Sequence, residues 1–258
     1  MALRSRVRLP RIQSLVRANA ILQAVASAPG GDARLIDIQR ATGLRKTTVH
    51  TLLETLAALG FVAHDRERHI YRLGLRILQL GRLAESHTDL ALVARPTLIR
   101  LCHATRETVN LALPGPTDAL VISSLEGAYG VRATSYTGWR IYYHASALGK
   151  AMLANFDQAH RQAIYEAGAL VAFTRNTITD PAALERAVTR IRSDGFSMDM
   201  EEAELGLRAV AVPLVGRNGH VFGAISVSGP AARLTQAVMR GIAQRIRRES
   251  AQVLKRLE

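Results

Sequence analysis

The 258-residue chain has little cysteine, few aromatic residues and few acidic residues relative to basic ones. Its single cysteine, Cys102, excludes an intrachain disulfide and a zinc site built from several thiolates. No apolar run approaches the ~18 residues that indicate a transmembrane helix. No hydrophobic segment of signal-peptide type follows the basic N-terminus. We therefore expect a cytoplasmic protein that does not contact a membrane.

The shortage of acidic residues is greatest in the first third of the chain. The whole chain carries 34 Lys and Arg against 21 Asp and Glu, which gives a net charge of +13. Residues 1–82 hold 14 basic and 5 acidic residues, a net of +9, whereas residues 83–258 hold 20 and 16, a net of +4. Such asymmetry favours a polyanion as the partner of the first third. Charge alone leaves a basic protein that binds no nucleic acid as an equal alternative.

The first third reads as three helices followed by a β-hairpin. Helical spacing and β-type composition predict elements at 12–27, 34–41, 45–59, 61–65 and 69–73. A tight turn containing Gly43 separates the second and third helices, and Gly60 is a candidate for the residue that ends the third. Three helices with such a turn, followed by a hairpin, are typical of a winged helix-turn-helix.

The third predicted helix concentrates its polar residues in its first two turns. Cations are poorly placed there for the helix macrodipole, but they are well placed for phosphates, because this end of the helix meets DNA in a helix-turn-helix. The residues that we expect to contact the major groove are Arg45, Lys46, Thr47, Thr48, His50 and Thr51. Those expected to contact the DNA backbone or the minor groove are Arg66 and Arg68 in the hairpin turn, and Arg4, Arg6, Arg8 and Arg11 near the N-terminus. A solvated polar face is the competing interpretation, but the turn, the hairpin and the charge distribution all favour DNA.

The remainder of the chain mixes helical and β-type patterns, which indicates a sheet with helices packed on it. Helices are expected at 74–88, 90–105, 145–155, 157–167, 181–194 and 231–257. Strands are expected at 107–113, 119–126, 131–136, 208–215 and 221–229. Asp180 and Gly195 have the properties of the N-cap and the terminating residue of the 181–194 helix. The pair Asn218-Gly219 favours a hairpin between the last two strands.

Catalytic patterns in this second region are weak. His144, Ser146 and Lys150 lie near one another, but neither a nucleophile elbow nor a phosphate-binding loop surrounds them. An acidic run could suggest a metal site, but a solvated loop explains it better: Asp199, Glu201, Glu202 and Glu204. We expect no enzymatic activity, no metal and no cofactor.

The last predicted strand, at 221–229, carries two hydroxyl groups among apolar residues. Ser226 and Ser228 alternate with Ile225 and Val227, so both hydroxyls lie on one face of the strand. If that face is buried, the hydroxyls need hydrogen-bond partners. A polar ligand, the backbone or water could each supply them.

Several segments match a known family in order and over nearly the whole chain. They are IQSLVRANAILQAV, ATGLRKTTVHTLLETLAALGFV and YRLGLRILQLG in the first half, and HASALGKAMLA, TRNTITD, GFSMDMEEAELGLRAVAVPL and GAISVSGP in the second. The chain thereby resembles IclR-type bacterial transcription regulators. The resemblance implies an α+β fold with a winged helix-turn-helix DNA-binding domain at 1–73, a linker helix at 74–88 and a GAF-like α/β effector-binding domain at 89–258. It also implies a ligand-responsive repressor or activator of a catabolic operon, which binds near-palindromic operator DNA as a homodimer or homotetramer.

The resemblance further implies a pocket for a small organic or aromatic acid. The positions that correspond to it are Gly130, Ala133, Ile141, Ala147, Leu148, Asp199, Leu207, Ala209, Ser226 and Ser228. In the family, the helix that starts after HAS offers N–H groups to a ligand carboxylate, here those of Ala147 and Leu148, and a helix N-terminus does favour anions. Small residues at several positions suggest a roomy pocket with Tyr129, Trp139 or Tyr143 near its mouth. Thr51 stands where family members commonly have arginine.

Two other classes of function compete with this one. An enzyme could use a basic N-terminal region to tether itself to nucleic acid, but it would need a catalytic constellation within residues 107–229, where the sequence suggests none. An architectural DNA-binding protein would have no need of so large a mixed α and β domain. A ligand-responsive regulator accounts for both halves.

Overall fold

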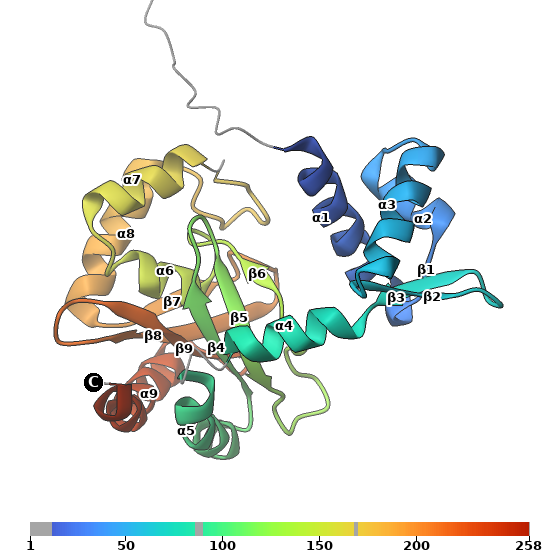
Figure 1. The fold of residues 1–258 in the computed structure, drawn as a ribbon. Helices are drawn as coiled ribbons and strands as arrows, with labels where there is room; N and C mark the ends of the chain where they lie inside the picture. The colour runs from blue at the N-terminus through green and yellow to red at the C-terminus, as the bar shows by residue number, and fades with distance from the viewer. Residues whose placement is uncertain (1–11, 86–89, 168–169, 258) are drawn as a thin grey trace, which may run out of the picture. The chain divides into compact units, whose positions relative to one another are not determined.

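The computed structural model describes residues 12–85, 90–167 and 170–257. The chain forms two compact units, Met1–Thr88 and Asp89–Glu258, and Figure 1 shows the elements of each. The N-terminal arginines expected to contact DNA, at positions 4, 6, 8 and 11, lie outside the described residues. No helix within these described ranges combines the length and the apolar character needed to cross a membrane.

The first unit is a winged helix-turn-helix. Its helices are α1 (Gln13–Ala26), α2 (Leu35–Thr42) and α3 (Lys46–Ala58), with a short 3-10 turn η1 (Pro29–Gly31) after α1. Its strands β1 (Ala33–Arg34), β2 (Val62–Asp65) and β3 (Ile70–Leu73) form an antiparallel sheet in the order β1-β3-β2. Apolar side chains from all three helices form its core and are completely or almost completely buried: Ile21, Val25, Ile38, Val49 and Leu53. The hairpin β2–β3 is the wing that the sequence predicts.

Two glycines set the ends of the second and third helices. Gly43 follows α2 with φ of +65°, and its N–H donates to the carbonyl of Gln39 at 2.9 Å. Gly60 comes after α3 with φ of +77°, at the position where a residue in the left-handed conformation commonly ends a helix. Residues that carry a Cβ rarely adopt this left-handed backbone conformation, so the glycines allow the sharp turns after both helices.

The helix α4 (Leu75–Glu85) lies within the range 74–88 that the sequence predicts. Apolar side chains on it are exposed within the chain, including Leu75 at 83% and Leu78 at 57%. A single helix turn of a soluble protein seldom exposes several leucines without a partner surface.

The second unit is built on a six-stranded antiparallel sheet in the order β6-β5-β4-β9-β8-β7. The strands are β4 (Thr108–Pro114), β5 (Ala119–Leu125), β6 (Arg140–Ile141), β7 (Ser197–Met200), β8 (Leu207–Val215) and β9 (Val221–Pro230). The helices α5 (Leu90–Thr105) and α9 (Gln236–Leu257) cover one face. The other face carries α6 (Ala147–Leu153), α7 (Gln158–Ala167) and α8 (Pro181–Asp194) (Figure 1).

Alternation along the central strands separates an apolar face from a partly polar one. Ile225 and Val227 of β9 are completely buried in the core beneath α5 and α9. Because successive side chains of a strand point to opposite faces, Ser226 and Ser228 face the α6 side, as does Asn110 on the adjacent strand β4. The sheet therefore brings three polar side chains to the face that carries α6.

The local signals for α8 and for the last hairpin are confirmed. Asp180 caps α8 by accepting hydrogen bonds from the N–H groups of Ala182 and Ala183, at 3.4 and 2.8 Å. Gly195 ends the helix with φ of +74°. The strands β8 and β9 pair in antiparallel fashion around the turn that contains Gly219, whose φ is +79°.

The strand predicted over 131–136 is wrong, because residues 132–136 have no regular secondary structure. Backbone carbonyl groups of this segment bond to side chains instead of to a neighbouring strand. Thr108 Oγ1 donates to the carbonyl of Ala133 at 2.7 Å, and Arg233 Nη2 donates to that of Val131 at 2.8 Å. The last helix also begins at Gln236 rather than 231, because β9 continues to Pro230 and a turn follows it.

Candidate functional site

A cavity of about 230 Å³ opens on the α6 side of the sheet. Its walls come from all six strands of the sheet, the first turn of α6, and the loops next to them. Eight of the ten pocket positions that the family resemblance implies line it: Ile141, Ala147, Leu148, Asp199, Leu207, Ala209, Ser226 and Ser228. The sheet and α6 thus bring together residues that lie up to 87 positions apart in the chain, from Ile141 to Ser228.

The other two implied positions, Gly130 and Ala133, are not among the lining residues. They belong to the irregular segment between β5 and β6, where the carbonyl of Ala133 is fixed by Thr108. Of the aromatic residues expected near the mouth, Trp139 lines the cavity. The Tyr143 hydroxyl instead donates to the carbonyl of Gly115 at 2.8 Å, away from the cavity. The ring of Tyr129 lies against the guanidinium groups of Arg106 and Arg233, with centroid distances of 4.9 and 4.2 Å.

The floor of the cavity is a row of paired residues across three strands. Ser228 of β9 pairs with Ala209 of β8, and Ala209 pairs with Asp199 of β7. Residues that oppose one another in antiparallel strands point to the same face of the sheet. The small side chain of Ala209 therefore leaves space between a hydroxyl and a carboxyl group.

Asn110 is a lining residue that sequence reasoning missed. Its Nδ2 donates to Ser228 Oγ at 3.1 Å, and its Oδ1 accepts from Ser124 Oγ at 2.6 Å. The partner of the Ser228 hydroxyl is therefore a side-chain amide. An asparagine within an otherwise apolar strand was the available signal, because a buried amide needs hydrogen-bond partners.

The first turn of α6 presents backbone N–H groups to the cavity. Ser146 is the N-cap, and its Oγ accepts from the N–H of Gly149 at 3.0 Å. The two preceding amides, of Ala147 and Leu148, have no acceptor among the described residues. They belong to the first-turn N–H groups that cannot bond within a helix, so they are open to an acceptor in the cavity.

The acidic run from Asp199 to Glu204, which begins in β7, is not the solvated loop that the sequence suggests. Asp199 is 3% exposed and Glu202 is 6% exposed, and only Glu204 of the run is well exposed. Asp199 lines the cavity, and its Oδ1 accepts from the N–H of Glu202 at 2.7 Å. Burial raises the pKa of Asp199 to about 7, because a desolvated carboxylate is disfavoured relative to the neutral acid. The described residues contain no group of three or more His, Cys, Asp or Glu side chains arranged to hold a metal ion.

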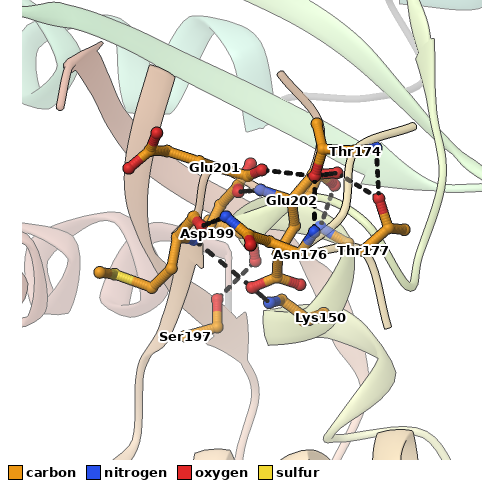
Figure 2. A network of polar contacts seen from close by, with 12 residues as sticks. Lys150, Thr174, Asn176, Thr177, Ser197, Asp199, Glu201 and Glu202 are labelled. Atoms are coloured by element: carbon orange, nitrogen blue, oxygen red, sulfur yellow. Dashed lines mark hydrogen bonds and ion pairs between the residues drawn. The ribbon is translucent and has the colours of Figure 1, made fainter. Parts of the chain in front are cut away.

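Figure 2 shows how the loop after β7 is held in place. Lys150 Nζ of α6 forms a buried ion pair with Glu202 Oε1. Thr177 Oγ1 donates to the carbonyl of Glu202 at 2.6 Å, and Thr174 Oγ1 donates to that of Glu201 at 2.7 Å. The loop is therefore tied both to α6 and to the segment before α8.

Aromatic side chains form the open end of the cavity. The rings of Tyr136 and Trp139 meet edge to face with centroids 5.4 Å apart, and those of Tyr142 and Phe173 are 5.1 Å apart. Trp139 is 60% exposed, which places it at the mouth. The cavity thus joins a buried polar floor to an apolar aromatic entrance.

Within the described residues, those expected to contact DNA lie on the solvent side of α3 and in the turn of the wing. On α3, Val49, Leu53 and Leu56 face the core. Of the six residues expected to contact the major groove, which are the N-cap Arg45 and five residues of α3, five are exposed and Thr48 is half-buried. Arg66 and Arg68 are exposed in the turn of the wing, and Arg68 Nη2 lies 3.7 Å from Asp32.

Two family models match the chain. The model of the IclR helix-turn-helix domain matches residues 14–66. The model described as bacterial transcriptional regulator IclR C-terminal matches residues 83–255. The matches fall on the two units separately and together cover most of the chain.

Individual proteins agree with these matches. The chain is 32% identical over 229 residues to the HTH-type transcriptional regulator XynR of Escherichia coli, covering 89% of this chain and 90% of that protein. It is similar to the crystal structure of Thermotoga maritima IclR, with a TM-score of 0.74, 25% identity and coverage of 96% and 99%. An IclR homologue from Microbacterium hydrocarbonoxydans, complexed with 4-hydroxybenzoate, shares the fold with a TM-score of 0.78 at 22% identity, over 94% of this chain and 98% of that one.

Proposed function

The chain belongs to the IclR family of bacterial transcriptional regulators, and we propose that its effector is a small carboxylic acid bound in the cavity of the second unit. The protein is a ligand-responsive regulator that binds DNA through its helix-turn-helix. Its relatives are named as regulators, so an enzyme with a nucleic-acid tether is not favoured.

The observation that carries the proposal is the arrangement of polar groups around one small space. Ser226, Ser228 and Asn110 supply hydrogen-bonding groups from the sheet, and the amides of Ala147 and Leu148 supply donors from α6. A carboxylate is an acceptor with two oxygens, so several converging donors suit it. Hydrogen bonds to a charged group contribute about 1.5–3 kcal/mol each, enough to fix the orientation of a small ligand.

The size and the entrance of the cavity favour a small acid with an apolar body. At about 230 Å³, the cavity is below the range of ~300–1,000 Å³ typical of drug-sized ligands. The aromatic residues at the open end offer ring faces and edges against which an aromatic ring packs well. The 4-hydroxybenzoate named with a neighbour of the same fold is therefore a suitable first probe.

In the first unit, the proposal assigns base and phosphate contacts to residues of α3 and the wing. Arg45 is the N-cap of α3 and Lys46 its first residue, and Thr47, His50 and Thr51 follow on its exposed side. Thr48 is half-buried, so its hydroxyl would contact DNA at the edge of this surface. The wing arginines, Arg66 and Arg68, would bind the backbone and position the helix rather than read sequence.

The proposal divides the chain into a DNA-binding domain at 1–73, a linker helix at 74–88 and an effector domain at 89–258. It includes assembly into a homodimer or homotetramer, because one recognition helix reads too few base pairs for useful specificity. Exposed leucines on α4 support a contact between protomers there. It also includes a cytoplasmic location, because the DNA target lies there, and control of a catabolic operon by repression or activation.

The test is a melting screen of the full chain with 4-hydroxybenzoate, benzoate and pyruvate, followed by operator-fragment binding with and without any acid that stabilises it. A ligand that stabilises the second unit should also change DNA affinity. The proposal fails if no carboxylic acid alters either quantity, or if an acid binds equally well when both Ser226 and Ser228 are replaced by alanine.

A further inference from the structure

Two buried carboxyl groups, of Asp199 and Glu202, stand beside the ammonium group of Lys150, and of these three residues only Asp199 lines the cavity. Lys150, Asp199 and Glu202 are each 6% exposed or less. Lys150 Nζ is paired with Glu202 Oε1, whereas Asp199 accepts from a backbone N–H (Figure 2). The second oxygen of Glu202, Oε2, has no hydrogen-bond partner among the described residues. One cation therefore compensates two carboxyl groups in a region of low dielectric, where an uncompensated charge is expensive.

The lining of the cavity does not supply a cation in addition to Lys150. Among the described residues, the only lysine or arginine that lines it is Arg140, and both Nε and Nη2 of Arg140 bond to Asp118 Oδ1 at 2.9 and 2.7 Å. The acidic lining residues are Asp199 and Glu204. An anionic ligand that enters this space would meet the Asp199 carboxylate without a free positive charge to balance it.

We propose that the cavity binds a monoanion together with one proton, and that this proton stays on Asp199 and forms a hydrogen bond to the ligand. Lys150 and Glu202 are the positioning residues that place this proton on Asp199. The inference rests on the proposed carboxylate effector. The binding step is balanced: an ionised Asp199, a ligand carboxylate and one proton from solution give a neutral Asp199 whose O–H donates to the ligand oxygen. No covalent bond changes apart from the O–H bond.

The chemistry of the groups around Asp199 supports this assignment. Burial raises the pKa of Asp199 to about 7, while the N–H of Glu202 and the Lys150 ammonium lower it and the Glu202 carboxylate raises it. The loop between β5 and β6 brings Tyr136 toward Asp199. On β8 and β9 the facing residues, such as Ala209, do not titrate.

The remaining ionisable groups nearby are His144, Arg140 and Glu204. Burial lowers the pKa of His144, and its Nε2 lies 2.9 Å from the carbonyl of Val171. Arg140 is bonded to Asp118, and Glu204 lies on the exposed part of the loop. Asp199 is thus the group positioned to exchange a proton when a carboxylate binds.

The proposal predicts the charge of the effector and how its affinity depends on pH. Above the pKa of Asp199, affinity for a monocarboxylate should fall about tenfold for each pH unit, because a proton must be taken from solution. Below that pKa the affinity should be constant. A dicarboxylate should bind at least tenfold more weakly than a monocarboxylate of similar shape, because its second charge has no partner. Terephthalate and 4-hydroxybenzoate are a suitable pair for this comparison.

The first experiment needs no ligand. Carboxyl-carbon NMR of the full-length, aspartate-labelled protein is recorded between pH 5.5 and 8.5, and the signal of Asp199 is assigned by its loss in Asp199→Asn. The expected result is a carboxyl group that is protonated at pH 6 and ionised at pH 8. A carboxyl group that is ionised throughout overturns the inference.

The second experiment separates positioning from simple structural support. Lys150→Gln removes the cation and should move the Asp199 midpoint to higher pH, whereas Glu202→Gln removes the neighbouring anion and should move it to lower pH. Lys150→Arg keeps the charge and should restore the wild-type midpoint. If the two glutamine variants shift the midpoint in the same direction, or leave it unchanged while folded, the positioning role is wrong.

The third experiment measures proton uptake by calorimetry with 4-hydroxybenzoate in two buffers of different ionisation enthalpy at pH 8. One proton should be taken up per ligand in wild type and none in Asp199→Asn, whose amide is neutral and can donate. Binding without proton uptake contradicts the inference while leaving the carboxylate effector intact. Absence of binding by any acid instead refutes the proposed function, and the ligand-free titration then decides whether Asp199 holds the proton.

Discussion

Asn110 Nδ2 donates to Ser228 Oγ at 3.1 Å between adjacent strands of the sheet. Because the amide nitrogen occupies one acceptor site of the hydroxyl, the O–H of Ser228 is free to donate elsewhere, and the cavity lies beside it. A ligand oxygen is the acceptor that this geometry suits.

Ser228→Ala should therefore weaken the effector. Loss of one hydrogen bond to a charged ligand costs about 1.5–3 kcal/mol, which corresponds to roughly a 10- to 150-fold loss of affinity. Fluorescence of Trp139, the only tryptophan in the chain and a residue at the mouth of the cavity, can follow the titration. Ser250→Ala, at a buried serine of α9, is the matched control and should bind ligand as wild type does. DNA affinity without ligand should be nearly unchanged in both variants.

Asp199→Asn should change how stability depends on pH. The folded pKa of about 7 lies above the ordinary value of 3.8, so the folded state binds a proton more tightly than the unfolded state. The stability from this group is complete below the unfolded pKa and is lost as pH rises through the folded pKa. In wild type it should fall by up to about 1.4 kcal/mol per pH unit between those values, a slope that Asp199→Asn lacks. Urea unfolding of both proteins at pH 5, 6 and 8 measures the difference, and parallel curves would contradict the prediction.

The double change Arg66→Ala and Arg68→Ala should weaken binding to all duplex DNA sequences together, because contacts to the backbone carry no sequence information. Each lost phosphate contact should lower the slope of log K against log salt by ~0.9. Titration of a promoter fragment and a random duplex at several salt concentrations measures both effects. The matched control, Arg186→Ala with Arg190→Ala, removes two exposed arginines of α8. An equal loss in the control would show a general charge effect and would remove the wing from the DNA interface.

Assembly can be tested through α4. Sedimentation of the full chain at micromolar concentration should give a dimer or tetramer rather than the 28.1 kDa protomer. Leu75→Ser with Leu78→Ser should shift the equilibrium toward smaller species, because both side chains are exposed within one chain and need an apolar partner surface. Leu92→Ser, at an exposed leucine of α5, tests whether any exposed leucine has this effect. A wild-type monomer at this concentration would rule out the proposed assembly.

Elements whose signals are local could be predicted from the sequence. Asp180 and Gly195 mark the ends of α8 because capping and a left-handed turn depend only on neighbouring backbone. The helix-turn-helix is predicted in the same way, from apolar spacing and a turn at Gly43. That Ser226 and Ser228 point to the same face of the sheet follows from strand alternation alone, so the sequence could indicate that their hydroxyls lie side by side.

What only the tertiary structure decided is which polar residues meet and which are buried. Glu202 is buried together with its ion-pair partner Lys150, which lies 52 residues earlier in the chain. Asn110 contacts Ser228 although 118 positions separate them, since β4 pairs with β9. The segment 131–136 alternates like a strand, yet side chains of Thr108 and Arg233 bond its carbonyl groups in place of a strand partner. Such outcomes depend on long-range pairing, because a charged or polar side chain is buried only where another part of the chain supplies its partner.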